Sequence, residues 1–153
     1  NLYLSRRARA EMKTSAFPIL VVCMAACART PSVPEGTEFI QFSSEGANYR
    51  YETTLYANDV VKRYGLDRDV SQDGEKEDYL NAEVGTYDKA IRLLEAEMPK
   101  ISETDDGRCL DSGPSSAIFV SEPIAGRSAV TNGCGNNVFQ ELAAKFIDLL
   151  PRE

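Results

Sequence analysis

The sequence predicts an α+β protein, a two-layer sandwich in which two helices cover one face of an antiparallel sheet, in the order β-β-β-α-β-β-α. Three observations support this fold class. Alternating stretches rich in tyrosine and threonine are typical of strands. Two longer segments carry apolar residues at helical spacing, and a proline follows each of them. With 153 residues and 42% hydrophobic content, the chain can bury one core.

Three strands are expected in the first half of the chain. Residues 39–43 (FIQFS) predict the first strand. Residues 49–56 (YRYETTLY) and 60–64 (VVKRY) predict a hairpin, because Asn58 and Asp59 between them are turn formers. The three strands would lie next to one another in the sheet.

An exposed loop and a helix are expected to follow. Residues 66–81 are acidic and polar, which predicts the loop. Thr86 is predicted to cap a helix that reaches Met98, and Pro99 would end it. One apolar stripe along this helix contains Tyr87, Ile91, Leu94 and Met98.

The second half repeats the pattern of two strands and a helix. Residues 117–120 and 128–131 predict a hairpin, and Asn136 or Asn137 could cap the last helix, which Pro151 would end. The apolar residues of that helix are Phe139, Leu142, Phe146, Ile147 and Leu150. The chain would thus pack two ββα halves around one sheet.

Charge and the lack of histidine exclude several classes of function. Without histidine, a Ser-His-Asp or Cys-His site is impossible and the commonest transition-metal ligand is missing. The first 27 residues hold four basic residues and one acidic residue, which leaves 13 basic and 23 acidic residues, a formal charge of −10, from Ala28 onward. Because so acidic a surface repels phosphate backbones, nucleic acid is not expected as a partner. No catalytic residue and no cofactor is predicted.

Residues 12–14 (MKT) begin a segment with the layout of a secretory signal peptide. One positive charge precedes an apolar stretch from Ala16 to Ala26, and small residues end it. The stretch has 11 residues and contains Pro18, so it is too short to span a bilayer as a helix. The sequence therefore predicts an exported protein.

Met24-Ala25-Ala26-Cys27 resembles the lipobox of bacterial lipoproteins, in which small residues precede an invariant cysteine and leucine is usual where Met24 stands. The resemblance implies that the Cys27 thiol is acylated, that the chain is cut just before it, and that a membrane is a partner through the lipid. In Gram-negative lipoproteins a residue other than Asp after the cysteine, here Ala28, implies the outer membrane, facing the periplasm. Two alternatives stay open: ordinary signal peptidase could cut at Ala26-Cys27-Ala28 and release a soluble protein, or the apolar run could be a buried helix.

The predicted organisation has three parts. Residues 1–27 are an upstream extension with the signal peptide and lipobox, residues 28–36 are a Pro-rich linker, and residues 37–153 form one globular domain. Cys109 and Cys134 are the only cysteines of that domain, and an oxidising compartment would favour a disulfide between them. Such a bridge would stabilise the fold by about 3–4 kcal/mol. Two free buried thiols or a metal pair are the alternatives, and zinc lacks ligands because neither CxxC nor histidine is present.

Residues 69–80 (DVSQDGEKEDYL) come closest to a metal motif. Oxygen ligands are available at the first, third and fifth positions, and Gly74 occupies the sixth, as in a calcium loop of the EF-hand type. The twelfth position, where a bidentate glutamate is required, is Leu80. A solvated acidic loop explains the same residues, so no metal site is predicted.

Three other stretches have both a functional and a structural interpretation. Residues 133–137 (GCGNN) place glycines before a helix but lack phosphate-binding spacing, which favours a turn beside a disulfide. Asp105, Asp106 and Asp111 could supply a carboxylate pair, yet they are also typical of turns. The hairpin tyrosines could form a recognition surface, although sheet packing is the favoured interpretation; they are Tyr49, Tyr51, Tyr56 and Tyr64.

These patterns predict an exported, lipid-anchored envelope protein with a non-enzymatic binding or structural role. A protein of the envelope is a candidate partner. One alternative is a secreted or periplasmic inhibitor whose acidic segment Asp67–Asp78 blocks a cationic enzyme. A carboxylate-dependent hydrolase is the other alternative.

Overall fold

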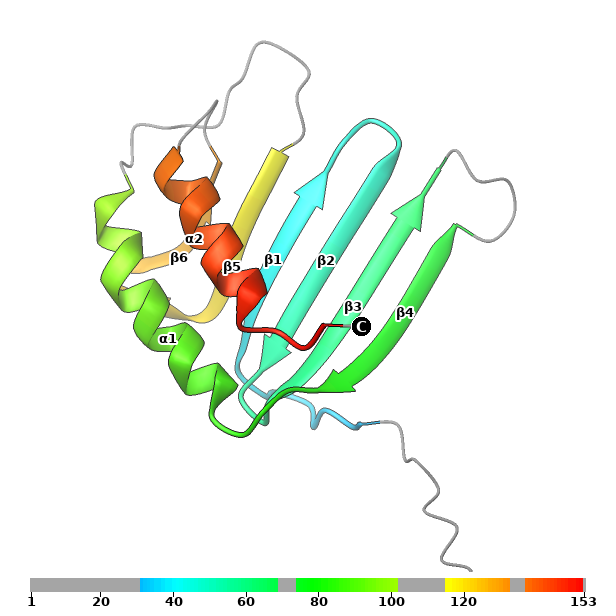
Figure 1. Ribbon diagram of the computed structural model, residues 1–153, viewed down its shortest axis with the longest axis horizontal. Coiled ribbons are helices and arrows are strands. Elements are labelled where there is room, and N and C mark those ends of the chain that lie inside the picture. Colours follow the sequence, from blue (N-terminus) through cyan, green and yellow to red (C-terminus); the bar gives the residue numbers. More distant parts are fainter. Residues whose placement is uncertain (1–30, 69–73, 102–114, 133–136, 153) are drawn as a thin grey trace, which may run out of the picture.

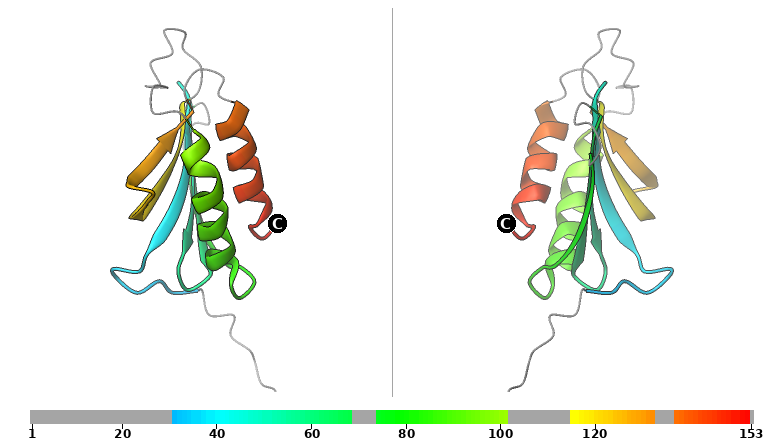
Figure 2. Two further views of the ribbon diagram at one scale, coloured as in Figure 1. Left: turned by 90° about the vertical axis from the view of Figure 1, so that its left-hand side faces the viewer. Right: turned by 90° about the vertical axis from the view of Figure 1, so that its right-hand side faces the viewer.

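A computed structural model describes residues 31–68, 74–101, 115–132 and 137–152. In these residues six strands form one antiparallel sheet, and two helices lie against it (Figure 1). Side views place both helices on the same face of the sheet (Figure 2). The predicted α+β class, with a helix layer on a sheet layer, is confirmed.

The chain builds a meander of four strands and then extends the sheet on the other side of its first strand. The strand order is β4-β3-β2-β1-β5-β6, so β1 lies inside the sheet. Its Ile40 is opposite Leu55 of β2 and Val120 of β5. The elements are β1 (Phe39–Glu45), β2 (Tyr49–Tyr56), β3 (Val60–Asp67), β4 (Glu75–Asn81), α1 (Thr86–Glu97), the 3₁₀ turn η1 (Met98–Lys100), β5 (Ser115–Ile124), β6 (Arg127–Thr131) and α2 (Asn137–Asp148).

The core lies between the helices and the sheet. Because side chains alternate along a strand, Ile40, Leu55, Val61 and Ile118 all point to the helix side, and none of the four has any exposed surface. The buried side chains of the helical layer are Tyr87, Ala90, Leu94, Met98, Phe139, Leu142, Phe146 and Leu150. The apolar stripes predicted from the sequence therefore supply most of the helix side of the core.

Ile147 is the exception in the second stripe, since 41% of its surface is exposed. Lys145 of α2 contacts Glu97 of α1 at 3.3 Å, which marks the flank of α2 that faces α1. Two residues further along a helix, Ile147 points away from that flank. The side of α2 remote from α1 thus carries an exposed apolar side chain.

A residue of the hairpin between β2 and β3 caps the N-terminus of α1. The carboxylate of Asp59 accepts hydrogen bonds from the backbone N–H groups of Gly85 (2.7 Å) and Tyr87 (2.8 Å). Thr86 is the first helical residue and is buried, so its predicted role as the cap is wrong. Asp59 lies 26 residues before Gly85, and a local capping pattern cannot reveal a cap supplied from that distance.

The other end of this helical segment is also held by the sheet. α1 ends at Glu97 with Met98 as its C-cap, so the predicted end of the helix before Pro99 is confirmed, and Pro99 itself lies within η1. Arg127, at the start of β6, donates hydrogen bonds from Nη1 to the carbonyl oxygens of Met98 (3.1 Å) and Ile101 (2.7 Å). A carboxylate thus meets the positive end of α1, and a guanidinium meets the carbonyl groups that follow it.

β4 is a strand where the sequence predicts a loop over residues 66–81. It pairs with β3 from Leu66 opposite Glu75 to Val60 opposite Asn81. The prediction failed because β4 is an edge strand: backbone hydrogen bonds to β3 hold it, and charged side chains protect its free edge from further pairing. The true order therefore has a fourth strand before the first helix.

The second hairpin and the last helix agree with the prediction. β5 and β6 include the predicted strands and turn back at Ala125 and Gly126, although β5 is longer and its register with β6 shifts between Phe119 and Ile124. α2 begins at Asn137. Within the described ranges, no helix combines the length and the hydropathy needed to cross a membrane.

Candidate functional site

The helices cover only part of the sheet face on which they lie. Three rows of paired residues cross β2, β3 and β4 on this face, and they change from apolar to polar along the strands. The first row, Leu55, Val61 and Leu80, belongs to the core. The second row is Thr53, Arg63 and Asp78, and the third row is Tyr51, Gly65 and Lys76. The core therefore ends after one row, and a polar surface begins beside it.

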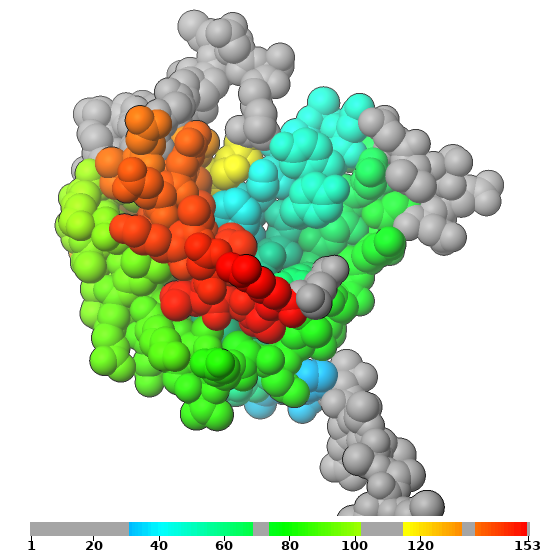
Figure 3. Space-filling view, viewed as in Figure 1, coloured from blue at the N-terminus to red at the C-terminus, as the bar shows by residue number. Residues whose placement is uncertain are grey.

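A cavity of about 680 Å³ is lined by the six residues of the two polar rows and by four of their strand neighbours, Glu52, Tyr64, Glu75 and Glu77. We call it the groove and define it by Tyr51, Thr53, Arg63, Gly65, Lys76 and Asp78. The space-filling view shows this part of the sheet uncovered beside α2 and the C-terminal segment (Figure 3). Its volume is within the range of small-molecule binding sites.

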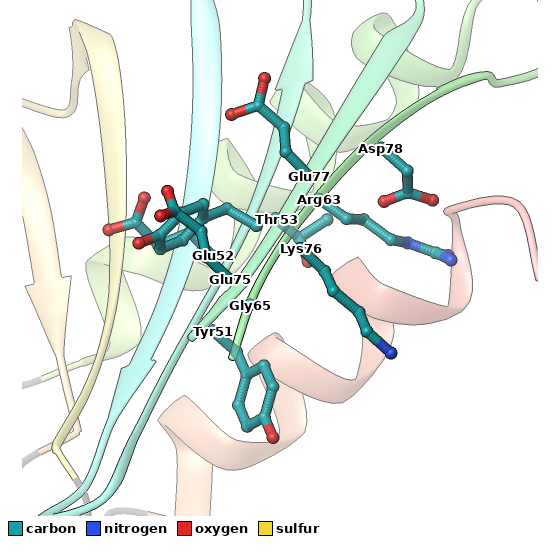
Figure 4. A pocket seen from close by; sticks show the side chains of 10 residues that line it. Tyr51, Glu52, Thr53, Arg63, Gly65, Glu75, Lys76, Glu77 and Asp78 are labelled. Atoms are coloured by element: carbon teal, nitrogen blue, oxygen red, sulfur yellow. The ribbon is translucent and has the colours of Figure 1, made fainter. Parts of the chain in front are cut away.

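The alternation of side chains along β2, β3 and β4 determines which of them point into the groove. In the close view, Tyr51, Lys76 and Arg63 extend toward the helix side, while Glu52 and Glu77 extend to the opposite side of the sheet (Figure 4). This follows from the two-residue alternation of strands. Glu52, Tyr64, Glu75 and Glu77 therefore border the cavity without pointing their side chains into the helix side.

Two tyrosine rings stack on each other at one end of the groove. The rings of Tyr49 and Tyr51 are 5.3 Å apart between centroids and inclined by only 30°. A Cβ atom on Gly65 would lie 3.3 Å from the ring of Tyr51, and one on Gly46 would lie 2.5 Å from the ring of Tyr49. Each ring thus lies against a glycine, where the missing side chain leaves room for it. Tyr51 remains 49% exposed.

The polar groups of the groove differ in how they are engaged. Arg63 donates a hydrogen bond from Nη2 to the carbonyl oxygen of Pro151, which ties the C-terminal segment to β3. The side chains of Tyr51, Lys76 and Asp78 make no hydrogen bond or ion pair with any residue that the structure describes. Lys76 and Asp78 are also exposed. These three side chains could bind a ligand without breaking an internal contact.

The opposite face of the sheet is different, because its charged groups neutralise one another. The Lys62 ammonium lies 2.8 Å from the Glu77 carboxylate and 5.6 Å from the ring centroid of Tyr79. The hydrogen bond from Lys62, followed by that from Tyr79, holds the pKa of Glu77 below its usual value. Glu52 accepts hydrogen bonds from Arg50 (2.8 Å) and Gln41 (3.1 Å). Engaged ion pairs of this kind are typical of a solvated surface.

The structure separates the four tyrosines of the hairpin. Tyr49 and Tyr51 lie on the groove side, whereas Tyr56 and Tyr64 lie on the opposite face. Tyr56 packs edge-on against Phe39, with 6.4 Å between the ring centroids. Tyr56 and Tyr64 thus fit the interpretation as sheet packing, whereas Tyr51 is exposed on the groove side, and a recognition surface there stays a prediction.

Several predicted site residues lie outside the described residues. These are Cys27, Cys109, Cys134, Asp105, Asp106, Asp111 and residues 133–136. The predicted disulfide, lipidation site and carboxylate pair therefore stay predictions. The calcium-like stretch lies partly outside as well, and its described part, Gly74–Leu80, leads into β4 rather than forming a loop. Among the described residues, no cluster of three potential metal-ligating side chains is present.

β4 also divides the acidic segment Asp67–Asp78, which the inhibitor hypothesis requires as one acidic surface. Glu75 and Glu77 belong to the opposite face, and Lys76 and Asp78 belong to the groove. The described part of this segment is therefore not a single acidic projection. Arg63 and Gly65 were not predicted as site residues from the sequence, and Lys76 and Asp78 were considered only as part of the acidic segment.

A glycine inside a strand pattern often marks a close approach, and this signal could have pointed to Gly65.

Comparison with known proteins gives no family: the chain matches no protein-family model, and no curated protein matches it with significance.

Proposed function

We propose that this chain is an exported, lipid-anchored binding protein whose recognition site is the groove. Cys27 carries the lipid, residues 28–36 form the tether, and the sheet domain binds its ligand without a catalytic step. The observation that carries the proposal is the set of exposed, unengaged side chains in the groove, Tyr51, Lys76 and Asp78. Aromatic rings with a few polar groups beside them are typical of recognition surfaces.

Binding is favoured over catalysis by the openness of the site. A carboxylic acid that acts in general acid catalysis is usually held in a buried position, which keeps it protonated near neutral pH. Asp78 is instead exposed, and Glu52 and Glu77 are engaged on the opposite face. The chain also has no histidine to act as a general base.

The position of the tether supports a role in binding away from the membrane. The side chain of Asn58, in the β2–β3 turn, donates to the carbonyl oxygen of Ser32 at 3.2 Å, so the linker meets the sheet at the end of β2. Tyr51 is near the start of β2, and five residues of strand separate it from Tyr56 by about 17 Å. The linker and the groove therefore lie toward opposite ends of the sheet (Figure 1). An anchor at Cys27 would leave the groove facing outward.

Two further features belong to the proposal. A Cys109–Cys134 disulfide would fit an oxidising compartment, where a bridge closing that loop would stabilise the domain. Ala28 after Cys27 would direct the lipoprotein to the outer membrane of a Gram-negative cell, with the domain in the periplasm. Non-reducing peptide mapping of the purified protein tests the disulfide, and free thiols at both positions would contradict it.

The anchor is tested by intact mass and membrane fractionation of the expressed protein. The wild type should gain the mass of acyl chains and remain with membranes, whereas Cys27→Ser should lose both. Cys23→Ala is the matched control, because Cys23 lies inside the apolar run and would be removed with the signal peptide. Soluble, unacylated protein from both the wild type and Cys27→Ser would overturn the lipoprotein proposal.

Binding through the groove is tested by capture of envelope material on immobilised protein. Tyr51→Ala should abolish the capture. Phe119→Ala is the matched control, since Phe119 is 40% exposed, close to the 49% of Tyr51, but lies on the opposite face of the sheet. Capture that both variants retain would show that the groove is not the recognition site.

A further inference from the structure

Two large apolar side chains that stay exposed lie on either side of one step in the protein surface. Tyr51 is 49% exposed on the floor of the groove, and Ile147 is 41% exposed on the side of α2 remote from α1. In Figure 1, α1 lies on one side of α2 and the strands β2 to β4 lie on the other, so Ile147 faces the uncovered part of the sheet. The helix layer therefore ends in an apolar flank beside an open floor.

The open floor has the width of one helix. The strands β2, β3 and β4 span two strand spacings, about 10 Å, and an α-helix with its side chains is about 10–12 Å across. Both helices stand on this face of the sheet, so the step beside them is one helix diameter high (Figure 2). A second copy that faces the first can thus place its α2 on the open floor, while its own floor receives α2 of the first copy.

The charges of the floor match those of α2. Lys76 and Asp78 on β4 are two residues apart, about 7 Å along the strand. Glu141 and Lys145 on α2 are four residues apart, about 6 Å along the helix axis. All four side chains are exposed. Glu141 makes no hydrogen bond or ion pair with any residue that the structure describes, and Lys145 keeps half of its side chain exposed beside Glu97.

The order of these charges selects one relation between the two copies. α2 and β4 both run toward the end of the sheet at which the linker enters (Figure 1). A two-fold axis midway between their directions turns α2 of a second copy parallel to β4. Glu141 of that copy then lies at Lys76 and its Lys145 lies at Asp78, whereas an α2 that ran the opposite way would bring like charges together. This axis points toward the linker end, so both linkers leave the dimer on the same side and both anchors can enter one membrane.

We infer that the partner of the groove is a second copy of this chain, in a symmetric dimer in which α2 of each copy lies in the groove of the other. The inference rests on the proposed function, because it concerns the same recognition site. Ile147 of one copy meets Ile147 of the other at the two-fold axis, and Tyr51 packs against α2 of the second copy. Two-fold dimers are the commonest symmetric assemblies, and their interface uses the same surface of both copies.

Cysteine cross-linking of the full chain in membranes tests the arrangement. Two cysteines form a disulfide only when their Cα atoms are within about 7 Å of each other. In Ile147→Cys the two thiols meet at the axis, so a mild oxidant should produce a covalent dimer on a non-reducing gel. Phe119→Cys is the matched control and should stay monomeric, since Phe119 is 40% exposed, close to the 41% of Ile147, but lies on the opposite face of the sheet. Equal cross-linking of both variants, or of neither, would overturn the inference.

A charge exchange tests the contact between Lys76 and Glu141. Lys76→Glu and Glu141→Lys should each weaken the dimer about tenfold in sedimentation equilibrium, because like charges then meet at two symmetry-related contacts. The double variant restores the opposite charges and should return the dissociation constant to within about threefold of the wild type. Two single variants that dimerise like the wild type would contradict the predicted pairing and overturn the dimer.

The capture experiment separates this inference from the proposed function. With envelope extract from cells that express the chain, the material captured through Tyr51 should be the chain itself, as identified by mass spectrometry. Capture of another molecule through Tyr51, together with a monomeric protein in sedimentation, would overturn the dimer and leave the groove as the recognition site. If capture does not depend on Tyr51 and Ile147→Cys does not cross-link, both the dimer and the groove fail.

Discussion

Removing the Asp59 carboxylate should destabilise the protein, because it frees the N-terminus of α1 from the β2–β3 turn. Asp59 accepts two hydrogen bonds, from the N–H groups of Gly85 and Tyr87, at 2.7 and 2.8 Å. A lost N-cap costs about 0.5–2 kcal/mol, and a bond to a charged group contributes about 1.5–3 kcal/mol. Asp59 is half-buried, so water can replace part of its hydrogen bonding to the two N–H groups when the carboxylate is removed. We therefore expect the cap to contribute about 2 kcal/mol to the free energy of unfolding.

The backbone conformation of residue 59 makes a second contribution to the stability loss, which can be separated from that of the cap. Asp59 has a φ of 58°, which alanine adopts at a cost of about 1 kcal/mol relative to glycine. Asp59→Ala should therefore lower the free energy of unfolding by about 3 kcal/mol and Asp59→Gly by about 2 kcal/mol. Asp59→Asn retains one acceptor oxygen and tolerates this conformation, so its loss should be about 1 kcal/mol.

Urea denaturation followed by circular dichroism measures these differences. Asn58→Ala is the control in the same turn, and it should change the stability by no more than about 0.5 kcal/mol. Hydrogen exchange provides the local test, since the amides of Gly85 and Tyr87 should exchange faster in Asp59→Ala. The reasoning is refuted if Asp59→Ala unfolds like Asn58→Ala, or if the protection of those two amides does not change.

Other perturbations test the remaining contacts. Arg127→Met should cost about 2 kcal/mol in thermal or urea unfolding, because two carbonyl groups after α1 lose their donor, and a loss below about 0.5 kcal/mol would contradict this. Gly74→Ala should cost about 1–3 kcal/mol, since its Cβ would lie 2.1 Å from a backbone oxygen across the β3–β4 connection; wild-type stability would disprove the close approach. Hydrogen bonds from Lys100 and then Lys145 lower the pKa of Glu97, so its contribution to stability is present above the usual glutamate pKa and is lost as the pH falls through the lowered value. In a carboxyl NMR titration, Lys145→Met should move the Glu97 pKa back toward its usual value, and no movement would exclude that contact.

The sequence predicted those parts of the fold in which burial is periodic. The stripes containing Leu94 and Phe146 identify the helices, and residues 49–56 and 60–64 give the first hairpin. β4 was missed because its side chains are charged or exposed along most of its length, and its stability comes from backbone pairing that no side-chain pattern records. Ile147 was counted with the apolar residues of the last helix, but such a pattern does not show where the covered surface of the helix ends.

The groove could not be predicted for a similar reason. Tyr51, Gly65 and Lys76 come from three strands, and they become neighbours only through the register of β2, β3 and β4. One of those strands was not in the predicted fold. The tyrosine pattern did suggest a recognition surface, but only the register shows that Tyr51 and Tyr64 lie on opposite faces.

The internal position of β1 also affects how the domain forms as it is synthesised or exported from its N-terminus. The first four strands pair with neighbours in sequence and can fold as soon as they emerge. The other edge of β1 must wait for β5, where Phe42 meets Ile118. Until then an open edge and the apolar side chains of β1 are exposed together, the combination that favours aggregation. We therefore expect this interval to be the stage at which a holding chaperone most improves the yield of folded protein, and a chain truncated before Ser115 to be far less soluble than the whole.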